Sequence, residues 1–232
     1  TFVREIVFDT ETTGLSAEED RVIEIGCVEI IDLVPTGKNF HVYINPTHPV
    51  SKGAFNIHGL SNEFLKTKPT FTRVVNRFLR FIGDSQLVAH NATFDIRMIN
   101  AELRRQNLPE LENPVVDTLK LSRERRPGGK HTLDALCSFY GIDNSRRKKH
   151  GALLDSEILA EVYVELCGGR QMSLAIPEQQ ESTDKVIFPP ARQRPNPLVR
   201  RMTAEEIAAH KAFVDALGDK AIWKQYEAEQ AT

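Results

Sequence analysis

The sequence carries almost no net charge. Its 30 Lys and Arg residues stand against 32 Asp and Glu residues, which leaves a formal charge of -2 over 232 residues. The chain therefore lacks the broad positive field with which many proteins hold nucleic acid, and any polyanion must be bound locally. Basic residues gather in only two stretches, 123–130 and 146–149. Each stretch by itself is explained well enough by a solvated loop.

Cysteine is also scarce. Cys27, Cys137 and Cys167 are odd in number and far apart, and no C-x-x-C pair is present to hold zinc or run redox chemistry. We expect buried thiols in a reducing compartment. No apolar run approaches transmembrane length, and the strand-like segment 2–8 contains charged residues, so we expect neither a signal peptide nor a membrane partner. A cytoplasmic location follows as an expectation.

Hydrophobic patterns predict an α/β fold. Apolar runs and alternation predict three strands, at 2–8, 22–31 and 39–44. A turn at 35–37 would join the second and third strands into an antiparallel hairpin beside the first. Helical patterns then alternate with short strands, the helices at 71–82, 92–107, 132–139 and 151–167, the strands at 86–89 and 115–116. This order indicates a mixed sheet flanked by helices.

The composition changes after residue 169. Five prolines among polar residues predict an extended linker over 177–201. A capping box at Thr203–Glu206 then opens a helix whose apolar stripe is Ile207, Val214 and Leu217, with Gly218 at its end. A single amphipathic helix cannot bury its own stripe, so this helix needs a partner or must fold back on the domain.

Two carboxylates follow the first predicted strand. If the chain stays extended beyond residue 8, Asp9 and Glu11 point to the same face, because strand side chains alternate with period two. Neighbouring carboxylates repel each other unless a cation lies between them, and oxygen ligands of this kind suit magnesium or manganese. An acidic pair on a surface loop is the alternative explanation, since a D-x-E pattern alone is common.

A second group, His90, Asn91, Phe94 and Asp95, lies where a predicted strand meets a helix. Asn91 is a favourable N-cap, which places Asp95 in the first helical turn, where the helix dipole stabilises a carboxylate. That is a sufficient structural role. The functional hypothesis is that Asp95 projects towards Asp9 as a further metal ligand, since ligands gather at the carboxyl ends of strands in such sheets.

A third group is His150 and Asp155. On one continuous helix they would lie about 140° apart and could not share a face. They converge only if His150 lies in the loop before the helix that carries Asp155, and the basic residues at 146–149 indicate such a loop. An exposed histidine and a capping aspartate are the alternative.

Together these segments resemble a known family. D-x-E-x-T-G, H-N-x-x-F-D and H-x-x-x-x-D, in this order, are similar to the three motifs of the DEDD exonuclease superfamily, in its histidine branch. The resemblance implies a ribonuclease H-like fold with a mixed five-stranded sheet, and removal of nucleotides from the 3′ end by two divalent ions, Mg²⁺ or Mn²⁺. It implies that Asp9, Glu11, Asp95 and Asp155 bind the metals and that His150 is the general base.

Within the superfamily, the resemblance extends furthest towards the proofreading subunits of bacterial replicative DNA polymerases, in residues 39–43, 55–59, 133–137, 150–163 and 203–210. It implies a single-stranded 3′ end of DNA as substrate. It also implies nucleotide contacts from Thr10, Glu11, Ile57, His58, Phe94 and Asp155. Without the resemblance, His58 would be interpreted as a turn residue.

The tail gains a meaning from the same resemblance. Gln171, Met172, Ser173, Leu174, Ala175 and Ile176 resemble a peptide that binds the β sliding clamp, although a final isoleucine predicts weak affinity, and a frayed helix end is the alternative. Ile207, Val214, Leu217 and Trp223 would contact the α subunit of the polymerase, and a small accessory subunit is a further possible partner. The implied division is a nuclease domain at 1–169, the peptide at 170–176, the linker at 177–201 and the docking segment at 202–232.

Two rival functions stay open on the sequence. Ribonucleases that trim RNA 3′ ends share the three motifs, but a compact RNA trimmer needs no such tail. A structural adaptor with a silent nuclease domain is the other rival. All five catalytic positions carry the expected residue types, which argues against silence.

Overall fold

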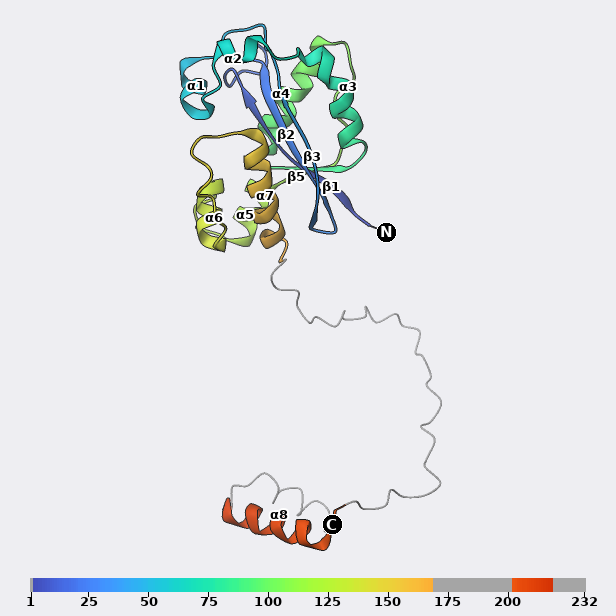
Figure 1. Ribbon diagram of the computed structural model, residues 1–232, viewed down its shortest axis with the longest axis vertical. Helices are drawn as coiled ribbons and strands as arrows, with labels where there is room; N and C mark the ends of the chain where they lie inside the picture. Colours follow the sequence, from blue (N-terminus) through green and yellow to red (C-terminus); the bar gives the residue numbers. More distant parts are fainter. Residues whose placement is uncertain (1, 169–201, 219–232) are drawn as a thin grey trace, which may run out of the picture. The chain divides into compact units, whose positions relative to one another are not determined.

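The computed structural model describes residues 2–168 and 202–218, which fall into two separate units. The first unit contains a sheet of strands β1 (Arg4–Thr12), β2 (Val22–Ile31), β3 (Val34–Tyr43), β4 (Gln86–Ala89) and β5 (Val115–Asp117). Its helices are α1 (Lys52–His58), α2 (Asn62–Lys66), α3 (Phe71–Ile82), α4 (Ala92–Arg105), α5 (Thr118–Arg125), α6 (Leu133–Tyr140) and α7 (Ala152–Leu166) (Figure 1).

The strands form one mixed sheet in the order β3-β2-β1-β4-β5. β1 pairs antiparallel with β2, and β2 pairs antiparallel with β3, so the predicted hairpin lies beside the first strand. β1 pairs parallel with β4, and β4 pairs parallel with β5. The helical segments before β4 and β5 carry the chain back to the end of the sheet at which β1 begins. This is the predicted ribonuclease H-like sheet, with β1 at its centre.

The predicted hairpin turn at 35–37 is wrong. The turn is at Asp32 and Leu33, which have φ values of 49° and 65°, and Pro35 lies in β3 opposite Ile30. A two-residue hairpin turn whose twist matches the strands needs positive φ at both central residues, and this geometry outweighs the preference of Pro and Gly for turns. Pro35 is tolerated because β3 is an edge strand.

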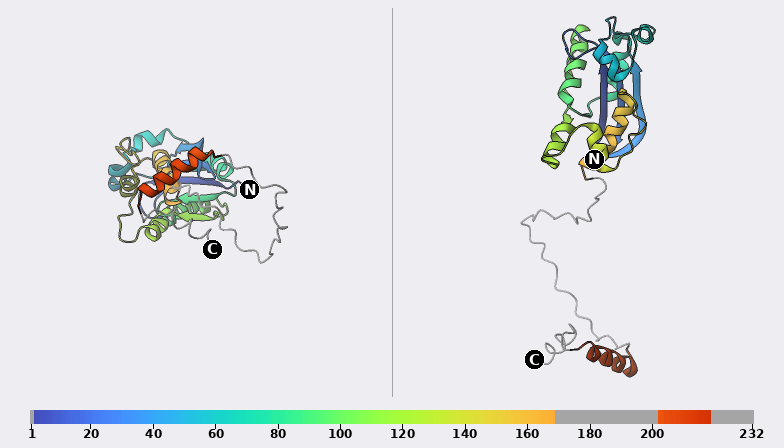
Figure 2. Two further views of the ribbon diagram at one scale, coloured as in Figure 1. Left: turned by 90° about the horizontal axis from the view of Figure 1, so that it is seen from below. Right: turned by 90° about the vertical axis from the view of Figure 1, so that its left-hand side faces the viewer.

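Helices cover both faces of the sheet. Ile6 and Phe8 pack into one core with α3 and α4, whereas Val7, between them, packs into the other core with α6 and α7. Figure 2 shows the orange α7 and the green α4 on opposite sides of the strands. In the predicted stripe of α7, Ile158, Val162 and Leu166 are buried, and Leu154 is partly buried. Side chains on the helices of both layers can therefore contact groups at the carboxyl end of β1.

Three short helices, α1, α2 and α5, have no counterpart among the helices that the sequence pattern predicts. His58 is the last residue of α1 and is buried. Gly59 is the C-cap of α1, and Thr67 is the C-cap of α2.

The second unit contains α8 (Ala204–Ala216), whose predicted capping box between Thr203 and Glu206 is formed. Ile207 and Leu217 are exposed and Val214 is buried. The peptide at 171–176, the linker at 177–201 and Trp223 lie outside the described residues. Among the helices that are described, none is long and apolar enough to cross a membrane.

Candidate active site

Asp9 and Glu11 lie on one face at the carboxyl end of β1. The strand stays extended to Thr12, so their side chains share a face by period two. Asp9 stands opposite Gly26 of β2, and Glu11 stands opposite Glu24. The pair therefore lies on the side of the sheet that α7 covers, as Val7 does.

Gly26 lets α7 approach the sheet. A Cβ atom built on Gly26 would lie 2.2 Å from the backbone of Ala152 and Leu153 at the start of α7. Ser156 Oγ donates a hydrogen bond to the Gly26 carbonyl oxygen at 2.9 Å. This contact brings the first turn of α7, with Asp155, next to Asp9. Sequence reasoning missed it, although an isolated glycine inside an apolar strand is a known sign of close backbone approach.

Asp95 reaches the end of β1 from the other layer. It lies in the first turn of α4, and its Oδ1 accepts hydrogen bonds from Thr10 N at 3.0 Å and Thr10 Oγ1 at 2.7 Å. The predicted N-cap at Asn91 is confirmed, although not through its side chain. Asn91 occupies the N-cap position with φ 66°, a left-handed conformation that asparagine tolerates, and its side chain makes no capping bond.

His150 lies in the loop before α7, the one arrangement in which it and Asp155 converge. His150 Nδ1 is 3.2 Å from Asp155 Oδ2. Ligand atoms of Glu11, His150 and Asp155 all lie within 4.8 Å of one another. Residues from β1, the 141–151 loop and α7 thus meet at one point.

Among the residues that the structure describes, too few cationic side chains lie near these carboxylates to balance their negative charge. Burial and the neighbouring carboxylates raise the pKa of Asp9 well above its usual value, and burial, Glu24 and Asp155 raise the pKa of Glu11 to about 8. Burial also raises the pKa of Asp95, against the hydrogen bonds from Thr10. Of the four carboxylates, only Asp155 has a lowered pKa, because the hydrogen bonds and positive charge of Arg147 outweigh its burial. An oxygen-only, electron-rich site of this kind fits hard divalent cations.

A cavity of about 590 Å³ adjoins the carboxylates. It is lined by five of the six residues predicted to contact a nucleotide, Thr10, Glu11, Ile57, His58 and Phe94. The sixth, Asp155, lines a neighbouring cavity of about 700 Å³ together with Asp9 and His150. Nε2 of His58 is buried and has no hydrogen-bond partner by distance and angle within the described part of the chain. Leu15, Ser51 and Ala54 also line the first cavity and were not predicted.

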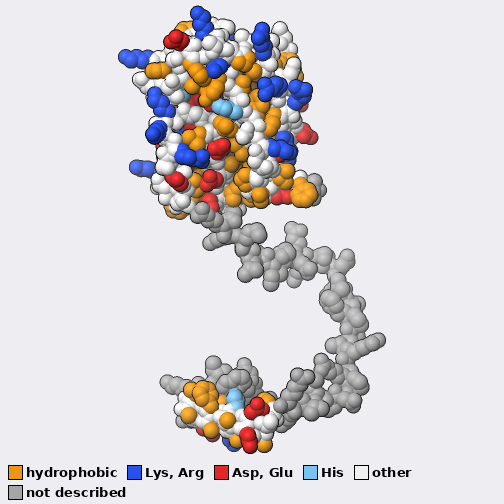
Figure 3. Space-filling view, viewed as in Figure 1, with side chains coloured by type: hydrophobic (Ala, Val, Ile, Leu, Met, Phe, Trp, Pro, Cys, Tyr) orange, Lys and Arg blue, Asp and Glu red, His pale blue; other side chains and the backbone are white. Residues whose placement is uncertain are grey.

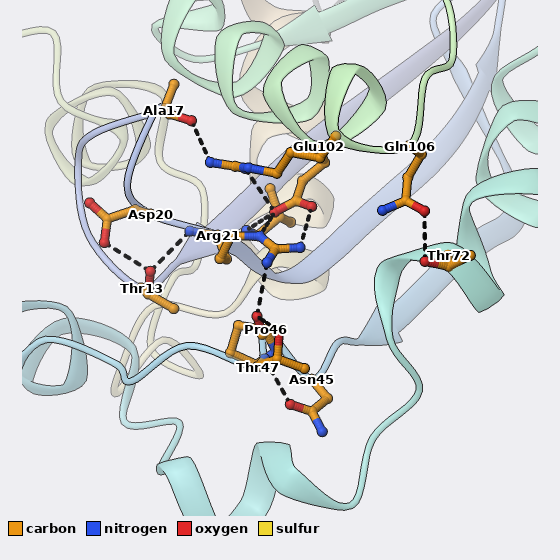
Figure 4. A network of polar contacts seen from close by, with 12 residues as sticks. Thr13, Ala17, Asp20, Arg21, Asn45, Pro46, Thr47, Thr72, Glu102 and Gln106 are labelled. Carbon is orange, nitrogen blue, oxygen red and sulfur yellow. Dashed lines mark hydrogen bonds and ion pairs between the residues drawn. The ribbon is translucent and has the colours of Figure 1, made fainter.

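The loop that carries Leu15 is fixed by ion pairs and hydrogen bonds (Figure 4). Arg21 donates from Nε and Nη2 to the two carboxylate oxygens of Glu102 on α4, at 2.6 and 2.9 Å. Thr13 Oγ1 donates to Asp20 Oδ1 at 2.9 Å. Gly14 fits here because a Cβ atom would lie 2.5 Å from the Asp20 carboxylate. Nothing in the sequence links Arg21 to Glu102, which lies 81 residues further along.

Comparisons with known proteins show the family to which the chain belongs. Residues 6–163 match the exonuclease family. The DNA polymerase III subunit epsilon of Rickettsia felis is 44% identical over 222 residues, covering 93% of this chain and 97% of that protein. That of Escherichia coli is 42% identical over 236 residues, covering 95% and 97%. The chain belongs to the epsilon-subunit family. It is therefore an exonuclease of the type that proofreads DNA replication, and exonucleases of this family work with divalent metal ions.

Solved structures support the fold of this epsilon-family chain. Exonuclease X in complex with 5′ overhanging duplex DNA has a TM-score of 0.58 and 29% identity, over 72% of this chain and 92% of that one. The zinc-bound complex of Escherichia coli exonuclease I with single-stranded DNA has a TM-score of 0.65 and 19% identity, over 73% and 41%. The second likeness shows the fold alone.

Proposed function

We propose that the chain hydrolyses the 3′-terminal phosphodiester of single-stranded DNA ends as the proofreading subunit of DNA polymerase III. Asp9, Glu11, Asp95 and Asp155 would hold two Mg²⁺ or Mn²⁺ ions, and His150 would be the general base. The observation that carries the proposal is the convergence of carboxylates from β1, α4 and α7 with His150 beside a nucleotide-sized cavity.

The chemistry follows from where these groups lie. When bound, the two divalent ions would activate the attacking water and stabilise the leaving 3′ oxygen. His150 accepts the proton of that water, because imidazole exchanges protons near neutral pH. The new bond joins the water oxygen to phosphorus, and the bond from phosphorus to the 3′ oxygen breaks. Asp155, 3.2 Å from Nδ1, stabilises the imidazolium that forms.

The cavity favours a splayed base of any identity. Ile57 and Phe94 offer apolar surface, and Leu15, with 77% of its surface exposed, stands at the same wall. Stacking on apolar and aromatic surface tolerates every base. Indifference to sequence suits proofreading, and selection then comes from fraying, since a mismatched end unpairs more easily than a matched one.

Partner proteins would provide the remaining contacts that hold the DNA. The net charge is -2, and on the face shown in Figure 3 blue Lys and Arg side chains are scattered among red acidic ones. The site would therefore bind only a few nucleotides. The α subunit of DNA polymerase III, bound through Ile207, Val214, Leu217 and Trp223, and the β clamp, bound weakly through 171–176, would hold the duplex in the cytoplasmic replisome. A small accessory subunit would be a further partner.

The test uses 3′-labelled primer-templates, matched and mismatched, and single strands of DNA and RNA of one sequence. Replacing Asp9 and Glu11 by alanine removes ligands worth several kcal/mol, so digestion should fall on the order of a thousandfold. Chelation of the metal should have the same effect. Glu112→Ala, an exposed carboxylate in the 106–114 loop, is the matched control. Undiminished digestion by the double variant would refute the assignment, and a preference for RNA would favour the exoribonuclease rival.

A further inference from the structure

Arg147 is not the solvated loop residue that its basic neighbours suggest. Its side chain is 8% exposed, whereas that of the adjacent Arg146 is 65% exposed. Arg147 Nε donates to Asp155 Oδ1 at 2.6 Å, and Arg147 Nη2 donates to Asp155 Oδ2 at 2.7 Å. The guanidinium thus donates to both carboxylate oxygens of Asp155, a candidate metal ligand, in the bidentate geometry that arginine favours.

The same guanidinium makes two more contacts. Arg147 Nη1 donates to Asp134 Oδ1 on α6 at 2.8 Å, and Nη2 lies 2.8 Å from His150 Nδ1. A guanidinium can only donate, so Nδ1 of His150 is the acceptor and carries no proton in this arrangement. Arg147 therefore engages the lone pair of Nδ1, the ring nitrogen that lies 3.2 Å from Asp155 Oδ2.

These contacts place a positive charge where a divalent ion must act. Among the described residues, Asp9, Glu11 and Asp95 form no ion pair, and Asp155 is the carboxylate of the four with which Arg147 pairs directly, although its charge also lowers the pKa of Glu11. A divalent ion that binds Asp155 meets both the repulsion of the guanidinium and competition for the same oxygens. A proton acceptor whose lone pair is already engaged cannot take a proton from water.

We propose that Arg147 is a resident counter-cation of the metal site: it balances Asp155 and holds His150 Nδ1 until divalent ions bind, and it then withdraws towards Asp134. In this role Arg147 acts through Asp155 and His150. The proposal rests on the metal assignment of the proposed function. It implies that metal loading and release of the base are one event.

The competing possibility is that Arg147 supports the ligand Asp155. The two predict opposite signs. Loss of a supporting partner weakens metal binding by about 10–100-fold. Loss of a competing cation strengthens it, by about tenfold or more for a like charge this near.

The experiment measures Mn²⁺ binding by calorimetry and by electron paramagnetic resonance, on the full chain without DNA. Arg147→Gln should bind Mn²⁺ about tenfold more tightly than the wild type. Arg146→Gln removes the same net charge from the next position and should change affinity little, because Arg146 is 65% exposed and its ion pair among the described residues is with Glu157, at 4.0 Å. Arg147→Lys keeps a charge but loses the fork, and its affinity should lie between those of wild type and Arg147→Gln.

Thermal unfolding supplies a readout besides metal affinity. Without metal, Arg147→Gln should melt at a lower temperature than the wild type, because buried Asp155 loses its partner. Added Mn²⁺ should raise its melting temperature by more than it raises that of the wild type. Unchanged or weaker Mn²⁺ binding by both Arg147 variants would overturn the proposal.

The wild type itself gives a test if Arg147→Gln fails to fold. The ¹⁵N resonance of Arg147 Nε should shift during titration with Mg²⁺, at the midpoint of metal binding. A resonance that stays in place while Mg²⁺ binds would overturn the proposal. A wild type that binds neither Mg²⁺ nor Mn²⁺ would instead contradict the proposed function, so the two failures are distinguishable.

Discussion

Replacing Gly26 by alanine should displace the catalytic face of α7. The added Cβ atom would lie 2.2 Å from the backbone at Ala152 and Leu153, and ordinary contact begins near 3.4 Å. The closest atoms must therefore separate by at least 1.2 Å, the difference between the two distances. The neighbouring atoms are backbone, so no side chain can rotate away to relieve the contact. The start of α7 must move off β2, and Asp155 moves with it.

The expected cost has two parts. Overpacking of this kind destabilises a protein by about 1–3 kcal/mol. A displacement of about 1 Å at a catalytic group reduces the rate on the order of a hundredfold. We therefore expect Gly26→Ala to remain folded, with a lower melting temperature, and to digest single-stranded DNA about a hundred times more slowly at saturating substrate. Digestion of a 3′-labelled oligonucleotide at several metal concentrations measures the rate.

Gly151→Ala is the matched control. Gly151 precedes the same helix with φ -161°, which is extended backbone, and an added Cβ atom there meets nothing within 4 Å. This variant should fold and digest DNA much as the wild type does. A Gly26→Ala protein with wild-type rate and metal affinity would refute the argument that close approach at Gly26 sets the position of Asp155.

Two further predictions concern pH and the cavity wall. The pKa of Glu11 is raised from 4.5 to about 8 by burial, Glu24 and Asp155, so the folded metal-free protein binds this proton more tightly than the unfolded chain. The contribution of Glu11 to the stability of the metal-free protein should therefore fall as pH rises from about 4.5 to 8. Mg²⁺ should raise the melting temperature more at pH 8 than at pH 6, which melting curves with Mg²⁺ and with chelator would measure. An equal rise in melting temperature at both pH values would contradict this prediction. Arg21→Gln leaves the buried Glu102 without its bidentate partner and should cost on the order of 3 kcal/mol in the free energy of unfolding. Because the loop with Leu15 loosens, KM for DNA should rise more than kcat falls. An unchanged KM would contradict the inference that the Arg21–Glu102 ion pair holds this loop in place.

The sequence by itself determined much of the sheet and which elements carry the candidate site residues. Period-two alternation placed Asp9 and Glu11 on one face once β1 stayed extended, and β2, α3 and β4 have the predicted bounds. Helix geometry required His150 to lie before the helix of Asp155, and the structure has it there. These features depend on local periodicity, which the residues themselves carry.

Tertiary structure alone decided how these pieces meet. The hairpin turns at Asp32 and Leu33 because strand twist selects positive φ over the residue preferences of 35–37. Gly26 admits α7, and Arg147 is buried against Asp155 although its neighbour Arg146 is exposed. Such contacts join residues distant in the chain or single out one residue of a charged run. Local patterns do not encode that choice, because it depends on which backbone and which charge the completed fold places opposite each side chain.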